Sequence, residues 1–283
     1  MQKSSYTEYF CTLPTLLWLF FFFIIPLMLV ISIALRPFDI EGNILSGWTL
    51  NSIRALSNWH HLAILWRTIW ISLLTTLGSL FIAIPTGYAI GRASAKAQKI
   101  LLLLVILPFW SSFIVRIFAW KSLLHPEGPI KQLLLALNLV EPSTLLLYNS
   151  WVVVLVSIYT FLPFAILPIY SAASKFDYTL LDAGMDLGLS RLRTFIYIFL
   201  PNIQEGIFTA AIIVLIPSLS SYVIPDIVGG PDSQMIGNLI VERVFVNRNL
   251  PEACALAFVL VVVTLIPLAG IFYLQKKALR NKE

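Results

Sequence analysis

Charged residues are scarce in this chain, and their scarcity excludes most soluble folds. Only 12% of its 283 residues are Asp, Glu, Lys or Arg, whereas 59% are hydrophobic. A soluble globular domain carries about a quarter of charged residues. The hydrophobic residues also form runs as long as the ~20 residues that a helix needs to cross a bilayer. We therefore predict an all-α integral membrane protein, because a helix satisfies its own backbone hydrogen bonds in lipid.

The sequence also lacks the motifs of common catalytic and metal sites. It contains no G-x-x-x-x-G-K-[ST] segment, so no P-loop for ATP is expected, and no H-E-x-x-H zinc motif. His60 and His61 are adjacent and His125 is alone, so no catalytic Ser–His–Asp set can be assembled. The two cysteines, Cys11 and Cys254, have neither disulfide-framework nor metal-ligand spacing. We predict that the chain is not an enzyme and that it holds neither a metal nor a cofactor.

Six apolar runs are candidate membrane spans. They lie at about residues 13–35, 64–91, 99–124, 148–173, 205–225 and 254–275. The first run is longer than the apolar core of a secretory signal peptide, so we predict a span there and not a cleaved leader. No stretch between the runs is long enough for a soluble domain. We therefore predict one transmembrane domain over residues 1–283.

The basic residues predict the orientation of these spans. If the N-terminus is placed in the cytoplasm, 11 of the 19 Lys and Arg residues fall on the inner side. The short loop between the second and third spans gives the clearest signal, because Arg92, Lys96 and Lys99 all lie in it. Positive residues favour the cytoplasmic side. We therefore predict that both termini are cytoplasmic, and that the positive charge marks an inner rim rather than a nucleic-acid partner.

A polar segment, residues 174–204, separates the fourth and fifth predicted spans. Its apolar residues recur at helical spacing, which predicts one or two short amphipathic helices at the inner surface. These apolar residues are Leu181, Met185, Leu192, Phe195, Ile196 and Phe199. Asp177 is placed to cap the first helix. Composition leaves two roles open: an anchor on lipid headgroups, or a docking surface for another protein.

The same segment resembles a motif of a known family. The pattern E-A-A, three residues, G, nine residues, I-x-L-P is typical of permease subunits of binding-protein-dependent ABC importers. The matching positions here are Asp182, Ala183, Gly184, Gly188, Ile198, Leu200 and Pro201. Every spacing is kept, although Asp182 stands in place of Glu and Gly184 in place of the second Ala. Gly184 and Gly188 are four residues apart, so they share a helix face that permits close approach.

The resemblance implies a fold, a role and a set of partners. The implied fold is that of a MetI-like type I ABC importer permease with six transmembrane helices in the bacterial inner membrane. Residues 174–204 would then be a cytoplasmic coupling loop. The residues implied to couple to an ATPase are Asp182, Ala183, Gly184, Asp186 and Gly188. The implied partners are a homologous second permease, two cytoplasmic ATPase subunits that bind the ATP, a periplasmic or lipid-anchored substrate-binding protein, and membrane lipid.

Two further stretches resemble permeases of the spermidine/putrescine importers, of the PotB type. They are residues 108–116 and residues 224–240, and the overall resemblance covers essentially the whole chain. It implies that the substrates are polyamines. The alternatives are an ABC permease for another small solute, such as sulfate, iron or a phosphonate, or a secondary transporter. The last would need an intramembrane acid for ion coupling, and the inner halves of the spans offer only Glu205 at an edge.

A polyamine site needs carboxylates for the ammonium groups and aromatic faces for the cationic chain. Asp226 is predicted at the outer end of the fifth span, with Tyr222 one turn earlier if the helix persists. Trp110 and Tyr159 lie near the middle of the third and fourth spans. Each also has a plainer role, in a loop or in packing. Arg116, in the outer half of its span, either snorkels to the interface or pairs with Asp226 when no substrate is bound.

Prolines interrupt several predicted spans. Pro108, Pro163 and Pro217 lie inside the third, fourth and fifth. They either kink their helices or break them around a shared cavity, where freed carbonyl groups meet water or substrate. The sequence leaves both possibilities open.

Overall fold

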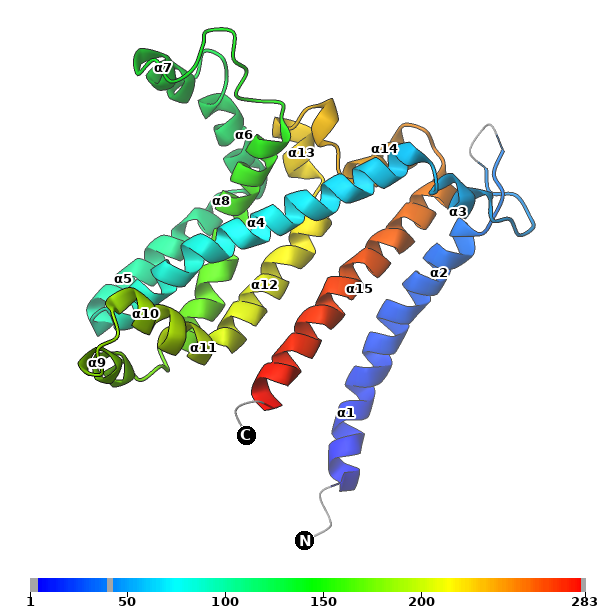
Figure 1. Cartoon of the computed structure of the whole chain (residues 1–283). Coiled ribbons are helices and arrows are strands. Elements are labelled where there is room, and N and C mark those ends of the chain that lie inside the picture. The colour runs from blue at the N-terminus through cyan, green and yellow to red at the C-terminus, as the bar shows by residue number, and fades with distance from the viewer. Residues whose placement is uncertain (1–4, 40–42, 281–283) are drawn as a thin grey trace. The chain divides into compact units, whose positions relative to one another are not determined.

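Every regular element in the described part of the chain is a helix. The computed structural model describes residues 5–39 and 43–280, where the β pairing is limited to an isolated bridge between Phe38 and Ile44. The helices (Figure 1) are α1 (Ser5–Leu19), η1 (Phe20–Ile24), α2 (Ile25–Ala34), α3 (Asn51–Ala55), α4 (Trp59–Arg92), α5 (Ala95–Ile106), η2 (Leu107–Trp110), α6 (Phe113–Leu123), α7 (Pro129–Ala136), α8 (Ser150–Ala173), α9 (Thr179–Asp186), α10 (Arg191–Thr194), η3 (Phe195–Phe199), α11 (Leu200–Asn202), α12 (Gln204–Leu219), α13 (Val223–Val228), η4 (Pro231–Ser233), α14 (Ile236–Phe245) and α15 (Leu250–Arg280). The predicted all-α class is confirmed.

Several of these helices are long and apolar enough to cross a membrane. Four do so alone: Thr12–Ala34, Trp59–Arg92, Ser150–Ala173 and Leu250–Tyr273. Two bent pairs pass the same test together: Ala95–Trp110 with Phe113–Leu123, bent by 90°, and Arg191–Asn202 with Gln204–Leu219, bent by 72°. Counting each bent pair as one span gives six, the number that the sequence predicts.

The chain divides into two compact units. The first is Met1–Ala63 with Leu239–Val262, and the second is Ile64–Asn238 with Val263–Glu283. In the first unit, a polar cluster surrounds Glu252 at the start of α15. Its carboxylate accepts a hydrogen bond from Asn249 Nδ2 (2.7 Å) and lies 3.0 Å from Arg243 Nε and 3.4 Å from His61 Nε2. The second unit contains all the candidate site residues, so the rest of the fold concerns that unit.

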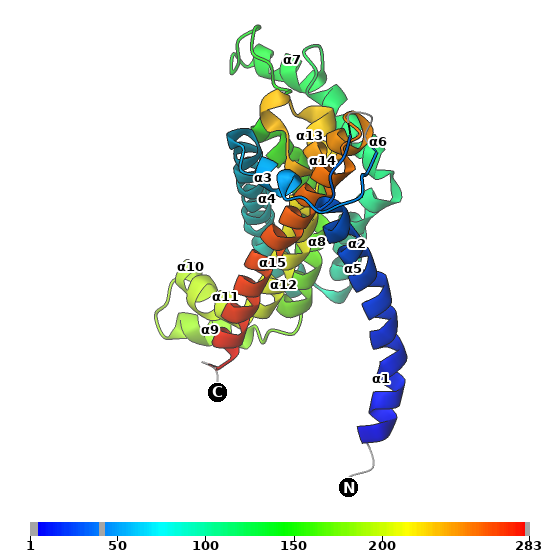
Figure 2. The ribbon, with the colours of Figure 1, turned by 90° about the vertical axis from the view of Figure 1, so that its right-hand side faces the viewer.

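Helices α8 and α12 pack side by side at the centre of the second unit (Figures 1 and 2). On α12, the buried residues Gly206, Ala210 and Val214 recur every four positions. Small residues at this spacing let two helices approach closely in lipid. On α8, Val153 and Ile169 are fully buried. The continuous apolar sequence of α8 therefore reflects its central position and not contact with lipid all round.

Helix α4 contributes a buried row of hydroxyl side chains. Thr68, Ser72, Thr75 and Ser79 are all fully buried. The Thr68 hydroxyl donates to the Ile64 carbonyl of its own helix (2.8 Å) and accepts a hydrogen bond from the Ile236 amide (2.9 Å). The first backbone amide of α14 is thus bound by a side chain of α4, which satisfies one of the donors that a helix start leaves free.

The third predicted span is not one helix. Pro108 cannot donate a backbone hydrogen bond, and the hydroxyl of Ser111 donates to the Pro108 carbonyl (2.8 Å). Ser111 and Ser112 are both extended, with ψ of 150° and 138°, so the chain turns between η2 and α6. By contrast, Pro163 lies inside an unbroken α8 and Pro217 just before the end of α12. Pro108 and Pro217 thus each lie close to the end of a helix, whereas Pro163 does not interrupt α8.

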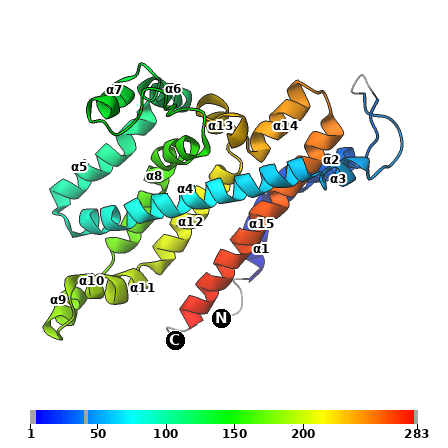
Figure 3. The ribbon, with the colours of Figure 1, turned by 45° about the horizontal axis from the view of Figure 1, so that its top comes forward.

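The fifth predicted span also ends early. Helix α12 stops at Leu219, where the Ser220 hydroxyl donates to the Ile216 carbonyl (3.3 Å) and competes with the backbone. The helix therefore does not persist to Asp226. A separate short helix, α13, carries that residue and packs against α6 and α8 (Figure 3).

Candidate functional site

Residues 174–203, which we call the loop, fold as short helices between α8 and α12. The loop helices start at side-chain caps. Asp177 Oδ1 accepts hydrogen bonds from the Thr179 hydroxyl (2.7 Å) and the Thr179 amide (3.0 Å), and these bonds hold the pKa of Asp177 below its usual value. Ser190 Oγ accepts from the Arg193 amide (3.4 Å) at the start of α10. Asp177 thus binds the first amide of α9 from one residue before the N-cap position, which Tyr178 occupies without a side-chain hydrogen bond.

A cluster of aromatic rings holds the loop on the end of α4. Tyr88 of α4 lies with its ring centroid 4.9 Å from Phe199 and 5.3 Å from Phe195, both edge-on. Phe176 and Phe199 are 5.3 Å apart, and Phe199 is fully buried. The Tyr178 hydroxyl donates to the Ala173 carbonyl (3.1 Å), and burial raises the pKa of Tyr178. Edge-to-face aromatic pairs stabilise by about 0.5–1.5 kcal/mol beyond their buried area, so the loop has a fixed base.

Helix α9 buries one face against the rest of the loop and exposes the other. Leu181 and Gly184 are buried, whereas Asp182, Ala183 and Asp186 are exposed. Leu187, directly after the helix, is 86% exposed, which is the largest exposure among the large hydrophobic residues of the described chain. Leu187 was not among the predicted site residues, although an apolar residue between Asp186 and Gly188 indicates a side chain that projects from the end of the helix. Exposed apolar surface of this kind marks a contact with another molecule.

The two glycines of the motif do different work. A Cβ on Gly184 would lie 2.6 Å from Ile198 Cδ1 and 3.2 Å from Thr194 Cγ2, so this position brings α9 against α10 and η3. Gly188 has φ of +89°, and a Cβ there would meet no atom within 4 Å. Its role is to end α9 with a left-handed residue, which glycine adopts without strain. Gly184 therefore permits a close approach, but the two glycines do not share a helix face, because α9 ends at Asp186 and Gly188 lies beyond it.

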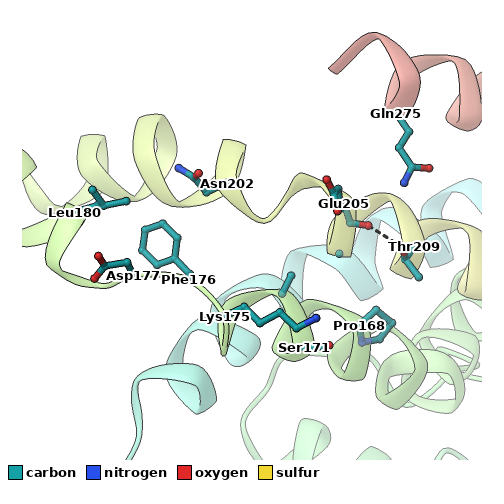
Figure 4. A pocket seen from close by; sticks show the side chains of 12 residues that line it. Pro168, Ser171, Lys175, Phe176, Asp177, Leu180, Asn202, Glu205, Thr209 and Gln275 are labelled. Atoms are coloured by element: carbon teal, nitrogen blue, oxygen red, sulfur yellow. Dashed lines mark hydrogen bonds between the residues drawn. The ribbon is translucent and has the colours of Figure 1, made fainter. Parts of the chain in front are cut away.

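A polar cavity of about 520 Å³ lies where the loop joins α8 and α12 (Figure 4). Its walls include Lys175, Asp177, Asn202, Glu205 and Gln275. The Thr209 hydroxyl donates to the Glu205 carbonyl (2.8 Å), and the Gln275 side chain reaches toward both residues from α15. Polar groups from four parts of the unit converge here, so the cavity suits water or a polar solute better than lipid.

A second cavity, of about 500 Å³, is almost entirely aromatic and apolar. We call it the aromatic cavity, and its walls include Phe109, Phe113, Arg116, Phe161, Phe164 and Pro217. The rings of Phe109 and Phe164 meet edge to face at 5.0 Å. The break after η2 and the late proline of α12 both border this cavity. Of the three prolines only Pro217 lines the cavity, and α8 passes it unbroken, so the structure does not show three broken helices around a shared cavity.

Arg116 is the charged residue that lines the aromatic cavity. Its guanidinium carbon lies 5.2 Å from the centre of the Phe109 ring, a cation–π contact. Its Nε is buried without a hydrogen-bond partner. The structure shows no ion pair between Arg116 and Asp226, both of which lie in the described part of the chain. The predicted pairing of these two residues is thus absent from this structure.

The other candidate residues lie apart from the aromatic cavity or at its edge. Trp110 lies near the middle of the third span, but it is the last residue of η2 and is 77% exposed at the break. Tyr159 lies within α8, where its ring packs edge to face on Trp120 at 5.4 Å. The wall of the aromatic cavity is formed instead by Phe109, the residue before Trp110, and by Phe164, five residues after Tyr159.

Tyr222 and Asp226 remain neighbours without sharing α12. Tyr222 precedes α13, and the Asp226 amide donates to the Tyr222 carbonyl (3.1 Å), one turn away. The same carbonyl accepts from Asn238 Nδ2 (2.8 Å). Both side chains are exposed, while Ile224 and Val228 of α13 are buried. The pair therefore presents one carboxylate and one phenol ring outward from a short, well-packed helix.

Comparison with known proteins gives consistent matches over most of the chain. The family model described as "binding-protein-dependent transport system inner membrane component" matches residues 83–280. The spermidine/putrescine transport system permease protein PotB of Haemophilus influenzae is 29% identical over 265 residues, covering 94% of this chain and 92% of that protein. The inner membrane ABC transporter permease protein YdcU of Escherichia coli is 32% identical over 243 residues, covering 81% and 76%. A bacterial alginate ABC transporter, solved in complex with an alginate pentasaccharide-bound periplasmic protein, aligns with a TM-score of 0.74 at 17% identity, over 97% of this chain and 96% of that one.

Proposed function

Since this chain belongs to the family of binding-protein-dependent transport system inner membrane components, we propose that it is the permease subunit of an importer for polyamines. It is a multi-pass inner-membrane protein and, as a permease, a non-catalytic membrane subunit. The observation that carries the polyamine assignment is the similarity to spermidine/putrescine permeases over 94% of the chain. ATP would be bound and hydrolysed by cytoplasmic partner subunits, and a second permease would complete the path.

The geometry of the loop supports its role as a coupling element. The aromatic cluster ties the loop to α4, and η3 and α11 lead directly into α12. A partner that grips the exposed side of α9, with Asp182, Asp186 and Leu187, would therefore move α4 and α12 together. We infer that two cytoplasmic ATPases, one for each permease, close on ATP and convert this movement into alternation between inward- and outward-open states. Both termini are then cytoplasmic.

Polyamines would meet two kinds of group along the path. On the side opposite the loop, Asp226 and Tyr222 offer a carboxylate and an aromatic face to a cation delivered by a periplasmic or lipid-anchored binding protein. Between the helices, the phenylalanine faces of the aromatic cavity attract an ammonium group and contact the methylene chain. The Phe109 ring already holds the Arg116 guanidinium. A substrate ammonium would have to replace that cation on the ring.

Replacing Asp226 by Asn tests the proposed cation contact. In an importer reconstituted with its partners, we expect Asp226→Asn to raise the KM for spermidine about two- to fivefold, because an exposed ion pair contributes ~0.2–1 kcal/mol. Uptake of labelled spermidine by proteoliposomes gives the KM. Asp232→Asn is the matched control, since Asp232 is an exposed carboxylate in the adjacent η4. An unchanged KM in an Asp226→Asn complex that assembles normally removes Asp226 from the path.

Gly188 gives a separate test of the loop tip. Gly188→Trp strains the left-handed backbone at this position, but a Cβ there meets no neighbouring atom, so the rest of the chain should keep its fold while the indole blocks a partner that seats the tip. We expect ATP hydrolysis to continue while uptake falls at least about tenfold, which corresponds to ~1.4 kcal/mol. Gly188→Asn tolerates the left-handed backbone and adds little bulk, so it should retain most uptake. Normal transport by Gly188→Trp would make the loop a simple connector.

A second candidate substrate class is favoured by one observation. Arg116 lines a membrane cavity with its Nε buried and without a hydrogen-bond partner, and a positive charge there suits a small anion such as sulfate or a phosphonate. Polyamine import and anion import predict opposite effects of removing this charge.

A further inference from the structure

A third cavity, of about 550 Å³, lies between the end of α4 and the loop. We call it the loop cavity, and its walls include Tyr88, Arg92, Met185, Arg191, Leu192 and Phe195. Two of these side chains are guanidinium groups, from different elements, and none of the residues that line the cavity is acidic. The loop cavity thus combines a positive rim with an apolar and aromatic floor. Neither the coupling role nor the substrate path uses this combination.

The two arginines of the loop cavity, Arg92 and Arg191, both have guanidinium donors available to an anion. Arg92 Nη1 donates to the Tyr88 hydroxyl (3.0 Å), which fixes the side chain at the cavity wall and leaves other guanidinium donors available. Arg191 begins α10, is exposed, and makes no ion pair within the described residues. A guanidinium presents its N–H donors in a planar fork that matches two phosphate oxygens. Two such forks around one cavity form a site for a phosphate group.

The apolar part of the loop cavity distinguishes a lipid from a small anion. Leu192 is 68% exposed at its edge, and Phe195 and Met185 are partly exposed beside it. A soluble phosphate would leave these surfaces in water. A phospholipid would cover them with its glycerol and first methylene groups, each buried methylene contributing about 0.8 kcal/mol.

The position of the loop cavity also fits a headgroup. Arg92 is the last residue of α4, a helix long and apolar enough to span a membrane. Its charge therefore lies at the level where lipid headgroups begin, and Lys96 and Lys99 follow directly in α5. Basic pockets between helices at this level bind anionic headgroups.

A carboxylate of a cytoplasmic protein partner is the other anion to consider. On α9, however, Met185 and Leu181 line the loop cavity, while Asp182, Asp186 and Leu187 do not, although the Asp182 carboxylate is near enough to Arg92 to interact with it electrostatically. The exposed tip of the loop is thus available to a protein on a different side. We propose that the loop cavity binds an anionic phospholipid, with its phosphate between Arg92 and Arg191 and its upper chain on Leu192 and Phe195.

Lipid binding by the purified full chain tests this proposal without substrate or ATPase. The chain in detergent would be titrated with phosphatidylglycerol or phosphatidylcholine, and bound lipid counted by native mass spectrometry. Each of the two arginines that contacts the phosphate should contribute about fivefold to binding, so the double variant Arg92→Gln/Arg191→Gln should bind phosphatidylglycerol about 30-fold more weakly. The control Lys96→Gln/Arg193→Gln removes the same charge outside the cavity. Because detergent supplies no charged lipid surface, this control loses only a longer-range attraction, and its binding should fall by at most about fivefold.

Several outcomes would overturn the proposal. Equal binding of the two lipids, equal loss in the control variant, or unchanged phosphatidylglycerol binding in the cavity variant would each do so. Displacement by glycerol phosphate at matched concentration would assign the site to a soluble anion. If the cavity variant keeps phosphatidylglycerol but no longer co-purifies with a co-expressed ATPase, the site takes a protein carboxylate. Arg191→Lys keeps the charge but not the planar fork, so it should bind phosphatidylglycerol more tightly than Arg191→Gln and less tightly than the unchanged chain, which excludes misfolding as the cause.

Discussion

Replacing Gly184 by Leu should reduce uptake by the assembled importer about 5- to 150-fold. Overpacking of a close contact costs about 1–3 kcal/mol, and here even a Cβ would lie 2.6 Å from Ile198 Cδ1. Helix α9 would have to move away from α10 and η3. The exposed residues of α9 would then no longer be held in a fixed position relative to the aromatic cluster. The movement of the closing ATPases would therefore not be transmitted to α4 and α12.

The measurement is uptake and ATP hydrolysis in the same proteoliposomes. Gly188→Leu is the matched control for side-chain size, because position 188 has free space but a left-handed backbone. It should strain the end of α9 without separating α9 from η3. If Gly184→Leu transports normally, α9 can shift without loss of coupling, and the rigid-base account of the loop fails.

Removing the charge of Arg116 should change substrate affinity in a direction that depends on the substrate's sign. For a polyamine, two positive charges about 8 Å apart at an effective dielectric of ~20 repel by ~2 kcal/mol. Arg116→Gln should therefore lower the KM for spermidine by about 30-fold. For sulfate or a phosphonate, the same variant should raise the KM by a similar factor. The Phe109 ring, freed of its guanidinium, becomes available to the incoming ammonium.

Arg116→Lys is the control for this experiment. It keeps the positive charge, so the KM for either class of substrate should stay within about threefold of the unchanged protein, less than 1 kcal/mol. A different result is also informative. If Arg116→Gln loses spermidine uptake and Arg116→Lys keeps it, then Arg116 serves as a required counter-charge, and the aromatic cavity is not where the cation passes.

The long helices were predictable because their apolar runs are continuous. Helix α8 begins at Ser150 and ends at Ala173, close to the predicted 148–173. A break near Pro108 was one of two possibilities, but its place at Ser111 and Ser112 was not predicted, because hydropathy averages over two serines inside an apolar run. The Ser111 hydroxyl helps to end the helix through a local hydrogen bond to the Pro108 carbonyl, and not through polarity alone. The end of α12 before Ser220 was not predicted for the same reason, because a single serine hardly changes the mean hydropathy of the run.

The candidate site was predictable only where it is local in sequence. The loop motif, its helical spacing and the Asp177 cap all follow from neighbouring residues. The aromatic cavity joins η2, α6, α8 and α12, and no pattern within one helix reveals which side chains will meet across helices. Sequence therefore selected Trp110 and Tyr159 for their chemistry, whereas the cavity wall is formed by Phe109 and Phe164. The different backbones and surroundings of Gly184 and Gly188 were likewise not visible in the sequence.

The break at Ser111 and Ser112 also constrains how the protein is made. Helix α6 has 11 residues and α5 has 12, so each is less than about 20 Å long, short of the ~30 Å hydrocarbon core. Neither piece can settle across the bilayer by itself as it leaves the ribosome. The extended backbone between them needs protein around it to satisfy its polar groups. Integration of this segment must wait until α8 and α13, against which α5 and α6 pack, have been synthesised, so membrane insertion of this chain is a cooperative event and not a helix-by-helix one.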